Sequence, residues 1–201
     1  MTTGIAAVTT IVSLVVMASG GVDSAALTMG FVPARVGGLL IEGAVPVLLT
    51  PLSATLIHAG LLHLGMNLLM LVFLGSQVER VVGGWALAFA YIVGAYVAVA
   101  AQYLVDPGTT MPMIGASGAI SALFGIYAMT AARPKWVTQS VAINRAIHAI
   151  WLLAAWVAIQ WMSQLLFSGQ GMMIATPAHI GGFIAGLALQ RPLLLWRYRK
   201  A

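Results

Sequence analysis

The sequence predicts an all-α polytopic membrane protein that folds as a bundle of six transmembrane helices. Of its 201 residues, 61% are hydrophobic and only 6% are charged. A soluble domain carries roughly 25% charged residues, so this chain cannot cover a soluble surface. Long apolar stretches recur between short segments that contain glycine, proline or charge, and each stretch can cross a bilayer as a helix. Cysteine is absent, which excludes disulfides.

The first predicted span covers about residues 3–19 and ends at Gly20. The connection that follows, about residues 22–61, is apolar but interrupted by several prolines and glycines. Such a segment favours short or re-entrant helices at the membrane interface rather than a spanning helix. An alternative makes residues 37–52 a further span, but Glu42 near its middle argues against it.

Five further apolar stretches complete the predicted bundle. They cover about residues 62–82, 85–105, 115–132, 147–167 and 177–195. The turn Asp106-Pro107-Gly108 closes the stretch that ends at residue 105. No second domain and no large repeat is evident, so residues 1–201 are predicted to form a single membrane domain.

Basic residues predict the orientation of these spans. With six spans, the loops rich in lysine and arginine all fall on one side of the membrane, and only Arg35 among the basic residues falls on the other. The positive-inside rule therefore places both termini in the cytoplasm. The basic residues lie beside apolar segments, so the net charge of +5 indicates topology rather than a nucleic-acid partner.

Three groups of polar residues lie inside the predicted spans, near their outer ends. Ser117 stands at the head of the run IGASGAISALFG, His63 and Asn67 are four residues apart, and His179 begins the last span. Residues four apart share one face of a helix. Polar groups in the membrane are costly, so each of them is a candidate functional residue. His58 is expected to lie at the interface, where a polar side chain is well solvated.

Small residues accompany two of these groups at helical spacing, and such stripes let membrane helices approach closely. If the stripes of the fourth and sixth spans meet, His179 comes within reach of Ser117. The residues expected to pack around the site are Gly115, Gly118, Ser121, Gly182 and Gly186.

This combination points to nucleophilic catalysis. A serine is a weak nucleophile until a base takes its proton, and a neutral histidine can be that base near pH 7. The helix that starts at Ser117 leaves backbone N–H groups that can hold an oxyanion, and His63 and Asn67 can add donors. No acidic residue lies in a span near His179, so the sequence predicts a Ser–His dyad rather than a triad. A His-Glu-x-x-His zinc motif is absent, and no metal or cofactor is expected.

Structural explanations compete with this one. For Ser117 alone, close helix packing is the better explanation. For His63 and Asn67, an interhelical hydrogen bond that only stabilises the bundle explains the pair about as well as a functional role does. His179 and His63 are also compatible with a proton relay in a small transporter, although no internal repeat of the kind found in transporters is evident. The convergence of all three groups at one membrane level favours catalysis.

These residues resemble the motifs of the rhomboid family of intramembrane serine proteases. The run Gly115-Ala116-Ser117-Gly118 resembles the family's G-x-S-G motif. The stretch from His58 to Asn67 resembles its histidine-rich second helix, and Ala178-His179 with Gly182 and Gly186 resembles its A-H-x-x-G-x-x-x-G motif. The three motifs follow the family's order along the six-span core.

The resemblance implies that Ser117 is the nucleophile and His179 the general base and acid, with an oxyanion hole made by His63, Asn67 and the N–H of Ser117. It implies single-span membrane proteins as substrates, cut within the lipid bilayer at a site that opens to the outer side. The connection at 22–61 would be the membrane-embedded first loop, and the fifth span would form the substrate gate. The minimal form suggests a bacterial plasma membrane, and a non-proteolytic rhomboid-like protein that binds transmembrane clients is the alternative.

Two positions depart from the family pattern. Ser121 stands where the family often has an aromatic residue that stacks on the catalytic histidine, so another contact must orient His179. The family's Trp-Arg pair in the first loop is also missing from residues 47–52. Neither departure removes a reacting group.

Overall fold

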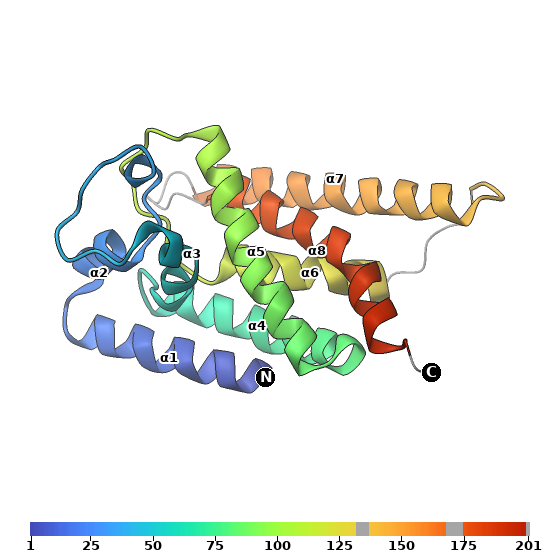
Figure 1. Ribbon diagram of the computed structural model, residues 1–201, viewed down its shortest axis with the longest axis horizontal. Helices are drawn as coiled ribbons and strands as arrows, with labels where there is room; N and C mark the ends of the chain where they lie inside the picture. The colour runs from blue at the N-terminus through green and yellow to red at the C-terminus, as the bar shows by residue number, and fades with distance from the viewer. Residues whose placement is uncertain (132–136, 168–174, 200–201) are drawn as a thin grey trace.

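The computed structural model describes residues 1–131, 137–167 and 175–199. Within these residues the chain is helical, and its only extended pairing is an isolated antiparallel bridge between Phe31 and Met113. The predicted all-α class is therefore confirmed, and the apolar helices form the bundle of a polytopic membrane protein (Figure 1).

The helices are named here in the order in which they follow one another along the chain. Their bounds are α1 (Thr2–Ala18), α2 (Val22–Met29), η1 (Pro33–Arg35), η2 (Val47–Leu49), α3 (Thr50–Ser53), η3 (Ala54–Leu56), α4 (Leu61–Val82), α5 (Gly84–Val105), α6 (Ser117–Ala131), α7 (Val141–Phe167) and α8 (Thr176–Arg197).

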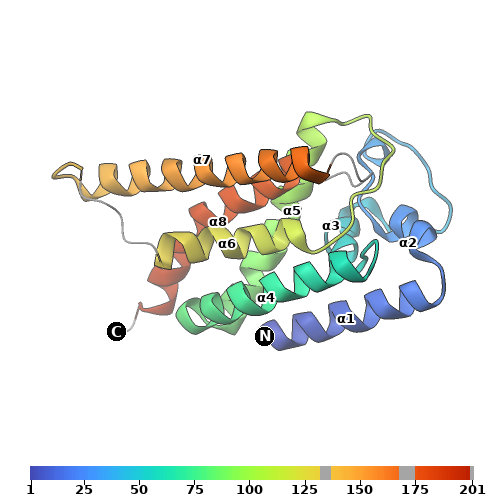
Figure 2. The ribbon, with the colours of Figure 1, turned by 180° about the vertical axis from the view of Figure 1, so that it is seen from behind.

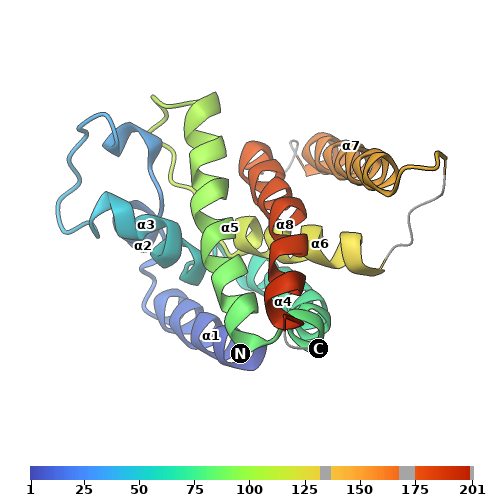
Figure 3. The same cartoon turned by 45° about the vertical axis from the view of Figure 1, so that its right-hand side comes forward.

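The centre of the bundle is α6, which packs against α4, α5 and α8. Figure 2 shows α7, α6, α4 and α1 following one another across the molecule, with α5 and α8 behind them. Fully buried Leu71, Leu87 and Leu123 come from α4, α5 and α6 and form part of one apolar core. The outer helix α7 rests mainly on α8 and has few buried side chains among its described residues (Figure 3).

Helix length separates four of these helices from the others. By length and composition, α4, α5, α8 and the segment Val141–Ile159 of α7 can each cross a membrane. The apolar helices α1 and α6 have 17 and 15 residues. At about 1.5 Å per residue, α6 is roughly 22 Å long, shorter than the roughly 30 Å hydrocarbon core. The count of six spans therefore stays a prediction.

The connection between α1 and α4 holds five short helices, α2, η1, η2, α3 and η3. The alternative span over residues 37–52 is wrong, because residues 36–46 form turns and extended chain rather than a helix. Arg35 fastens this part of the connection, since its guanidinium donates to the carbonyl of Val45 at 2.8 Å. The glycines and Pro46 explain why no continuous helix forms over residues 36–46, because both residue types disfavour a helix interior.

Helix ends differ from the predicted ones where side chains or backbone geometry intervene. The helix α6 begins at Ser117 rather than residue 115, because Gly115 has a left-handed φ of 107° that a helix does not accommodate. The helix α7 begins at Val141 rather than residue 147. There the Asn144 amide oxygen accepts the N–H groups of Val137 and Thr138 at 3.1 and 2.9 Å, and this fixes the entry turn. The predicted end of the fourth span, residue 132, lies outside the described residues.

Candidate active site

The start of α6 is held in place by the connection that precedes α4. Gly115 donates its N–H to the carbonyl of Ala54 at 2.9 Å. Two residues earlier, Met113 and Phe31 exchange two backbone hydrogen bonds of 2.8 and 3.0 Å. The left-handed Gly115 then turns the chain into α6, so that Ser117 is its first helical residue. The first N–H groups of a helix have no acceptor inside the helix.

Small residues allow α8 to lie directly on α6. A Cβ added to Gly182 would collide with the carbonyl of Gly118, and one added to Gly186 would collide with the carbonyl of Ala122. On the other side of α6, a Cβ on Gly118 would come within 2.7 Å of the Ala98 side chain on α5. The backbones of α6 and α8 are therefore in direct contact along the small-residue stripes.

This close approach brings Ser117 and His179 together. His179 lies in the first turn of α8, and its Nε2 is 2.7 Å from the Ser117 Oγ, which is hydrogen-bond distance. Both side chains are half-buried, so neither is closed off inside the bundle. A serine hydroxyl hydrogen-bonded to an imidazole nitrogen is the arrangement in which the imidazole can take the hydroxyl proton.

Ser121 lies between the two helices and not against the imidazole as a stacking partner. It is buried, and its hydroxyl donates to the carbonyl of Ser117 at 2.8 Å, one turn back in α6. Its Cβ is 3.2 Å from where a Cβ on Gly182 would stand. A larger residue at Ser121 would therefore push α8 away, so the small side chain belongs to the helix contact.

A contact from α7 reaches the backbone of His179. The indole Nε1 of Trp156 donates to the His179 carbonyl at 3.3 Å. The same indole stacks on Phe183, with ring centroids 5.4 Å apart and planes 18° apart, and meets Phe124 edge-on at 4.8 Å. Trp156 thus attaches α7 to α6 through Phe124 and to α8 through Phe183, which lies one helical turn beyond His179. No motif in the sequence predicted this contact of Trp156.

His63 and Asn67 occupy the first turns of α4, beside the loop that leads to Ser117. The Nδ1 of His63 accepts the N–H of Ala59 at 3.4 Å, so the proton of a neutral ring is on Nε2. That Nε2 is 2.8 Å from where a Cβ on Gly115 would stand, so this N–H faces the loop before Ser117. The Asn67 amide nitrogen donates one hydrogen to the His63 carbonyl at 2.9 Å, and its second hydrogen can serve another acceptor.

The position of His58 differs from the predicted one. It was expected at the solvated interface, but it is 1% exposed and lies behind the start of α6. Its Nε2 accepts the backbone N–H of Ala116 at 3.4 Å, and its Nδ1 is 2.9 Å from the hydroxyl of Ser13 on α1. Ser13 in turn donates to the carbonyl of Leu56 at 2.7 Å. In the sequence, only its place in the histidine-rich stretch before Asn67 could have indicated that His58 lies beside the site.

The donors in this chain of hydrogen bonds determine the His58 tautomer. A backbone N–H can only donate, so Nε2 is unprotonated and Nδ1 carries the hydrogen, which Ser13 accepts. Burial, with a smaller contribution from nearby His63, lowers the pKa of His58 from 6.5 to about 4. A neutral His58 therefore ties α1 to the residue directly before Ser117.

Comparison with known proteins assigns the family. The Rhomboid domain family model matches residues 47–196, which include Ser117, His179, His63 and Asn67. The chain belongs to the rhomboid family. The predicted family is thereby confirmed, and the three motifs that carried the resemblance all lie inside the matched region.

Curated relatives agree with this assignment. The chain is 33% identical over 138 residues to rhomboid protease GlpG of Pectobacterium atrosepticum and 29% identical over 137 residues to rhomboid protease GlpG of Yersinia pestis. It is 29% identical over 139 residues to rhomboid-related protein 2 of Mus musculus. These matches cover 68%, 68% and 69% of this chain but only 45% of each relative. The chain thus spans about half the length of the curated relatives it matches.

Proposed function

We propose that this rhomboid family member is an intramembrane serine endopeptidase that cleaves membrane proteins within the bilayer. The observation that carries the proposal is the 2.7 Å contact between Ser117 Oγ and His179 Nε2, at the start of a helix. The relatives named rhomboid protease GlpG support the same reaction class. A packing role alone explains the glycines around Ser117, but not an imidazole within hydrogen-bond distance of its hydroxyl.

In the proposed reaction, His179 Nε2 takes the hydroxyl proton as Ser117 Oγ attacks the carbonyl carbon of the substrate peptide. The carbonyl oxygen becomes an oxyanion, which the N–H of Ser117, the Nε2–H of His63 and the free amide hydrogen of Asn67 would hold. His179 then gives its proton to the leaving amine as the C–N bond breaks, leaving an ester on Ser117. A water molecule gives a proton to His179 and attacks the ester carbon. The C–O bond to Ser117 then breaks, His179 returns the proton to Ser117 Oγ, and the carboxylic acid product leaves.

Helix length supports a site at membrane depth. The described part of α6 is about 22 Å long, so if Ala131 is level with one membrane surface, Ser117 is roughly 8 Å short of the other side of a 30 Å hydrocarbon core. Ser117 would then lie below the outer surface, where a transmembrane substrate can reach it. Single-span membrane proteins are the proposed substrates. The positive-inside pattern supports a site that opens to the outer side, with both termini in the cytoplasm of a bacterial cell.

Fluorophosphonate labelling of the purified chain in detergent tests this proposal. A serine-directed fluorophosphonate should label the wild type, and Ser117→Ala should abolish labelling. His179→Ala should slow labelling by on the order of 10⁴ or more, because the base is lost. The matched control is Thr130→Ala, which removes a hydroxyl from the other end of α6 that donates to the carbonyl of Ile126 at 2.7 Å. It should label like the wild type.

Cleavage of a reconstituted single-span membrane protein completes the test, with thermal unfolding as the check that each variant is folded. Wild-type cleavage rates in Ser117→Ala would overturn the proposal. A folded wild type that neither labels nor cleaves would favour a rhomboid-like protein that binds transmembrane clients without cutting them.

A further inference from the structure

A groove of about 300 Å³ lies at the end of the bundle farthest from Ser117. It is bounded by the end of α4, the start of α5 and the end of α8. Its lining residues are Val82, Gly83, Gly84, Trp85, Ala86, Trp196, Arg197 and Arg199. Along α8 it lies about 27 Å from His179, so it takes no part in the proposed catalysis.

Two arginines are held at this groove by specific contacts. The guanidinium of Arg197 lies against the backbone of Gly83, where an added Cβ would be 3.5 Å from Nη1. Gly83 has a φ of 89°, which favours glycine and keeps this space free of a side chain. Arg199 lies over the Trp196 ring at 5.6 Å from its centroid. Between them, the hydroxyl of Tyr198 donates to the carbonyl of Val81 at 3.1 Å and holds the turn against α4.

No carboxylate neutralises these two guanidinium groups within the part of the chain that the structure describes. The acidic side chain nearest the groove is Glu79, whose Oε1 is 3.1 Å from where a Cβ on Gly84 would stand. Its two oxygens accept hydrogen bonds from the Met1 amino group at 2.6 Å and the Thr2 N–H at 2.9 Å. Among the described residues, the two positive charges at the groove therefore have no carboxylate partner and are available to an anion.

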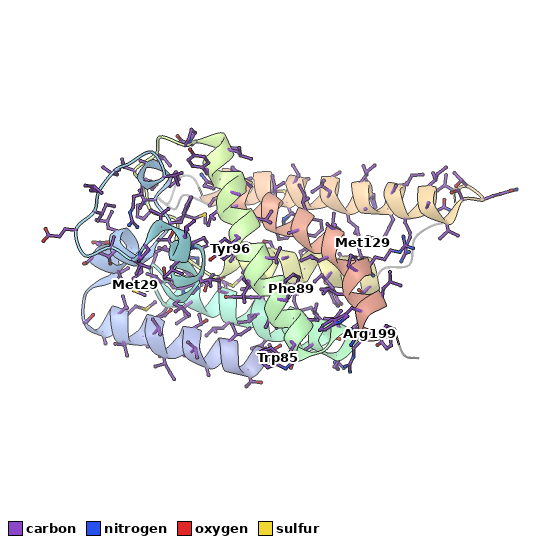
Figure 4. All side chains as sticks on the ribbon, viewed as in Figure 1. Met29, Trp85, Phe89, Tyr96, Met129 and Arg199 are labelled. Carbon is purple, nitrogen blue, oxygen red and sulfur yellow. The ribbon has the colours of Figure 1, made fainter. Side chains whose placement is uncertain are left out.

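An exposed apolar track leads away from the groove along α5. Trp85, Phe89 and Ile92 are 78%, 51% and 43% exposed, and their spacing of four and three residues places them on one face. Figure 4 shows Trp85 at the start of α5, near Arg199, with Phe89 and Tyr96 farther along the helix. Exposed tryptophans at the groove are typical of the membrane–water interface, and the apolar face beyond them suits lipid tails.

We propose that this groove binds an anionic phospholipid. The phosphate accepts hydrogen bonds from Arg197 and Arg199, and one acyl chain lies along Trp85, Phe89 and Ile92. Guanidinium groups match phosphate oxygens in geometry and charge. Two guanidinium groups with no carboxylate partner among the described residues favour a headgroup with net negative charge, such as phosphatidylglycerol, over a zwitterionic one. The continuous apolar track favours a lipid over a free phosphate ion, because only a lipid covers it.

Electron paramagnetic resonance of spin-labelled lipids tests the proposal. The full chain is reconstituted in phosphatidylcholine vesicles, and the motionally restricted fraction is compared for spin-labelled phosphatidylglycerol and phosphatidylcholine. Each arginine near an anionic lipid contributes about a fivefold preference. Arg197→Gln and Arg199→Gln should each reduce the phosphatidylglycerol preference about fivefold, and the double variant about 30-fold. Thermal unfolding shows whether each variant is folded. If the double variant does not fold, the comparison rests on the two single variants.

The matched control is Arg191→Gln, which removes the same charge from an exposed position on α8 outside the groove. It should leave the preference largely unchanged. An equal loss in Arg191→Gln and in the groove variants would overturn the proposal, since the preference would then be general surface electrostatics. Displacement of the labelled lipid by millimolar inorganic phosphate or by the acyl-free headgroup glycerophosphoglycerol would also overturn it, in favour of a site for soluble anions.

Discussion

The imidazole of His58 accepts the backbone N–H of Ala116, the residue directly before Ser117, at 3.4 Å. Ser13 on α1 holds the opposite nitrogen of the same ring at 2.9 Å. A helix distant in sequence from the candidate nucleophile thus supports the backbone that carries it. His58 is a positioning residue in this arrangement, because it supports the Ala116 backbone and meets the His63 ring edge-on, with ring centroids 4.9 Å apart.

Replacing His58 should therefore slow the proposed reaction without changing its chemistry. His58→Phe leaves the Ala116 N–H unpaired and buried, which costs about 1–3 kcal/mol of stability. It should lower kcat more than it raises KM, because the Ser117 backbone and the His63 ring, which His58 supports, are proposed to act in the transition state. His58→Asn, which can still accept a hydrogen bond, should recover part of kcat. Equal kcat in His58→Phe and the wild type, measured by cleavage of a membrane substrate, would contradict the positioning role.

Stability should fall as the pH is lowered, because burial depresses the pKa of His58 to about 4 from 6.5. Between these two values the unfolded chain binds a proton at this site that the folded chain does not. The contribution of neutral His58 is therefore fully present above about pH 6.5 and is lost as the pH falls toward 4. Unfolding free energy measured across this window should decline less steeply in His58→Phe than in the wild type. Parallel declines would show that His58 does not contribute.

Adding a methyl group at Gly182 should disrupt the contact between α6 and α8. The added Cβ would collide with the Gly118 carbonyl, so α8 must move and carry His179 with it. Overpacking of this kind costs about 1–3 kcal/mol, and a displacement of about 1 Å at reacting groups costs about 100-fold in rate. Gly65→Ala is the control, because a Cβ at this α4 position meets nothing within 4 Å. Fluorophosphonate labelling should drop in Gly182→Ala and persist in Gly65→Ala, and labelling that persists in both would argue against the contact.

Trp156 should control how firmly α7 rests on the site. Trp156→Ala removes the stack on Phe183 and the hydrogen bond to the His179 carbonyl, whereas Trp156→Phe removes only the hydrogen bond. Aromatic pairs contribute about 0.5–1.5 kcal/mol beyond the burial of their surface. Spin labels at Met162 and Ile184, both exposed, report the distance between α7 and α8. The distance distribution should broaden in Trp156→Ala but remain narrow in Trp156→Phe, and two narrow distributions would show that other contacts hold α7.

Local features of the sequence were sufficient to predict the helical class and the rhomboid family. Apolar runs and glycine or proline interruptions are read directly from neighbouring residues, since each helix satisfies its own backbone hydrogen bonds in a membrane. The small residues at helical spacing beside Ser117 on one helix and beside His179 on another likewise predicted that the two stripes could meet. In the structure the Ser117 Oγ lies 2.7 Å from the His179 Nε2. The catalytic roles of the two residues stay a prediction.

The partners of individual side chains depend on which helices are neighbours, and periodicity within one helix carries no such information. His58 looked like an interfacial residue because nothing in its own segment shows that α1 lies beside it and supplies Ser13. Ser121 was predicted to pack around the site, but its partner Gly182 is identified only by the packing of α8 on α6. The groove between Gly83 and Arg197 joins residues more than 100 positions apart, and only the packing of α8 against α4 and α5 brings them together.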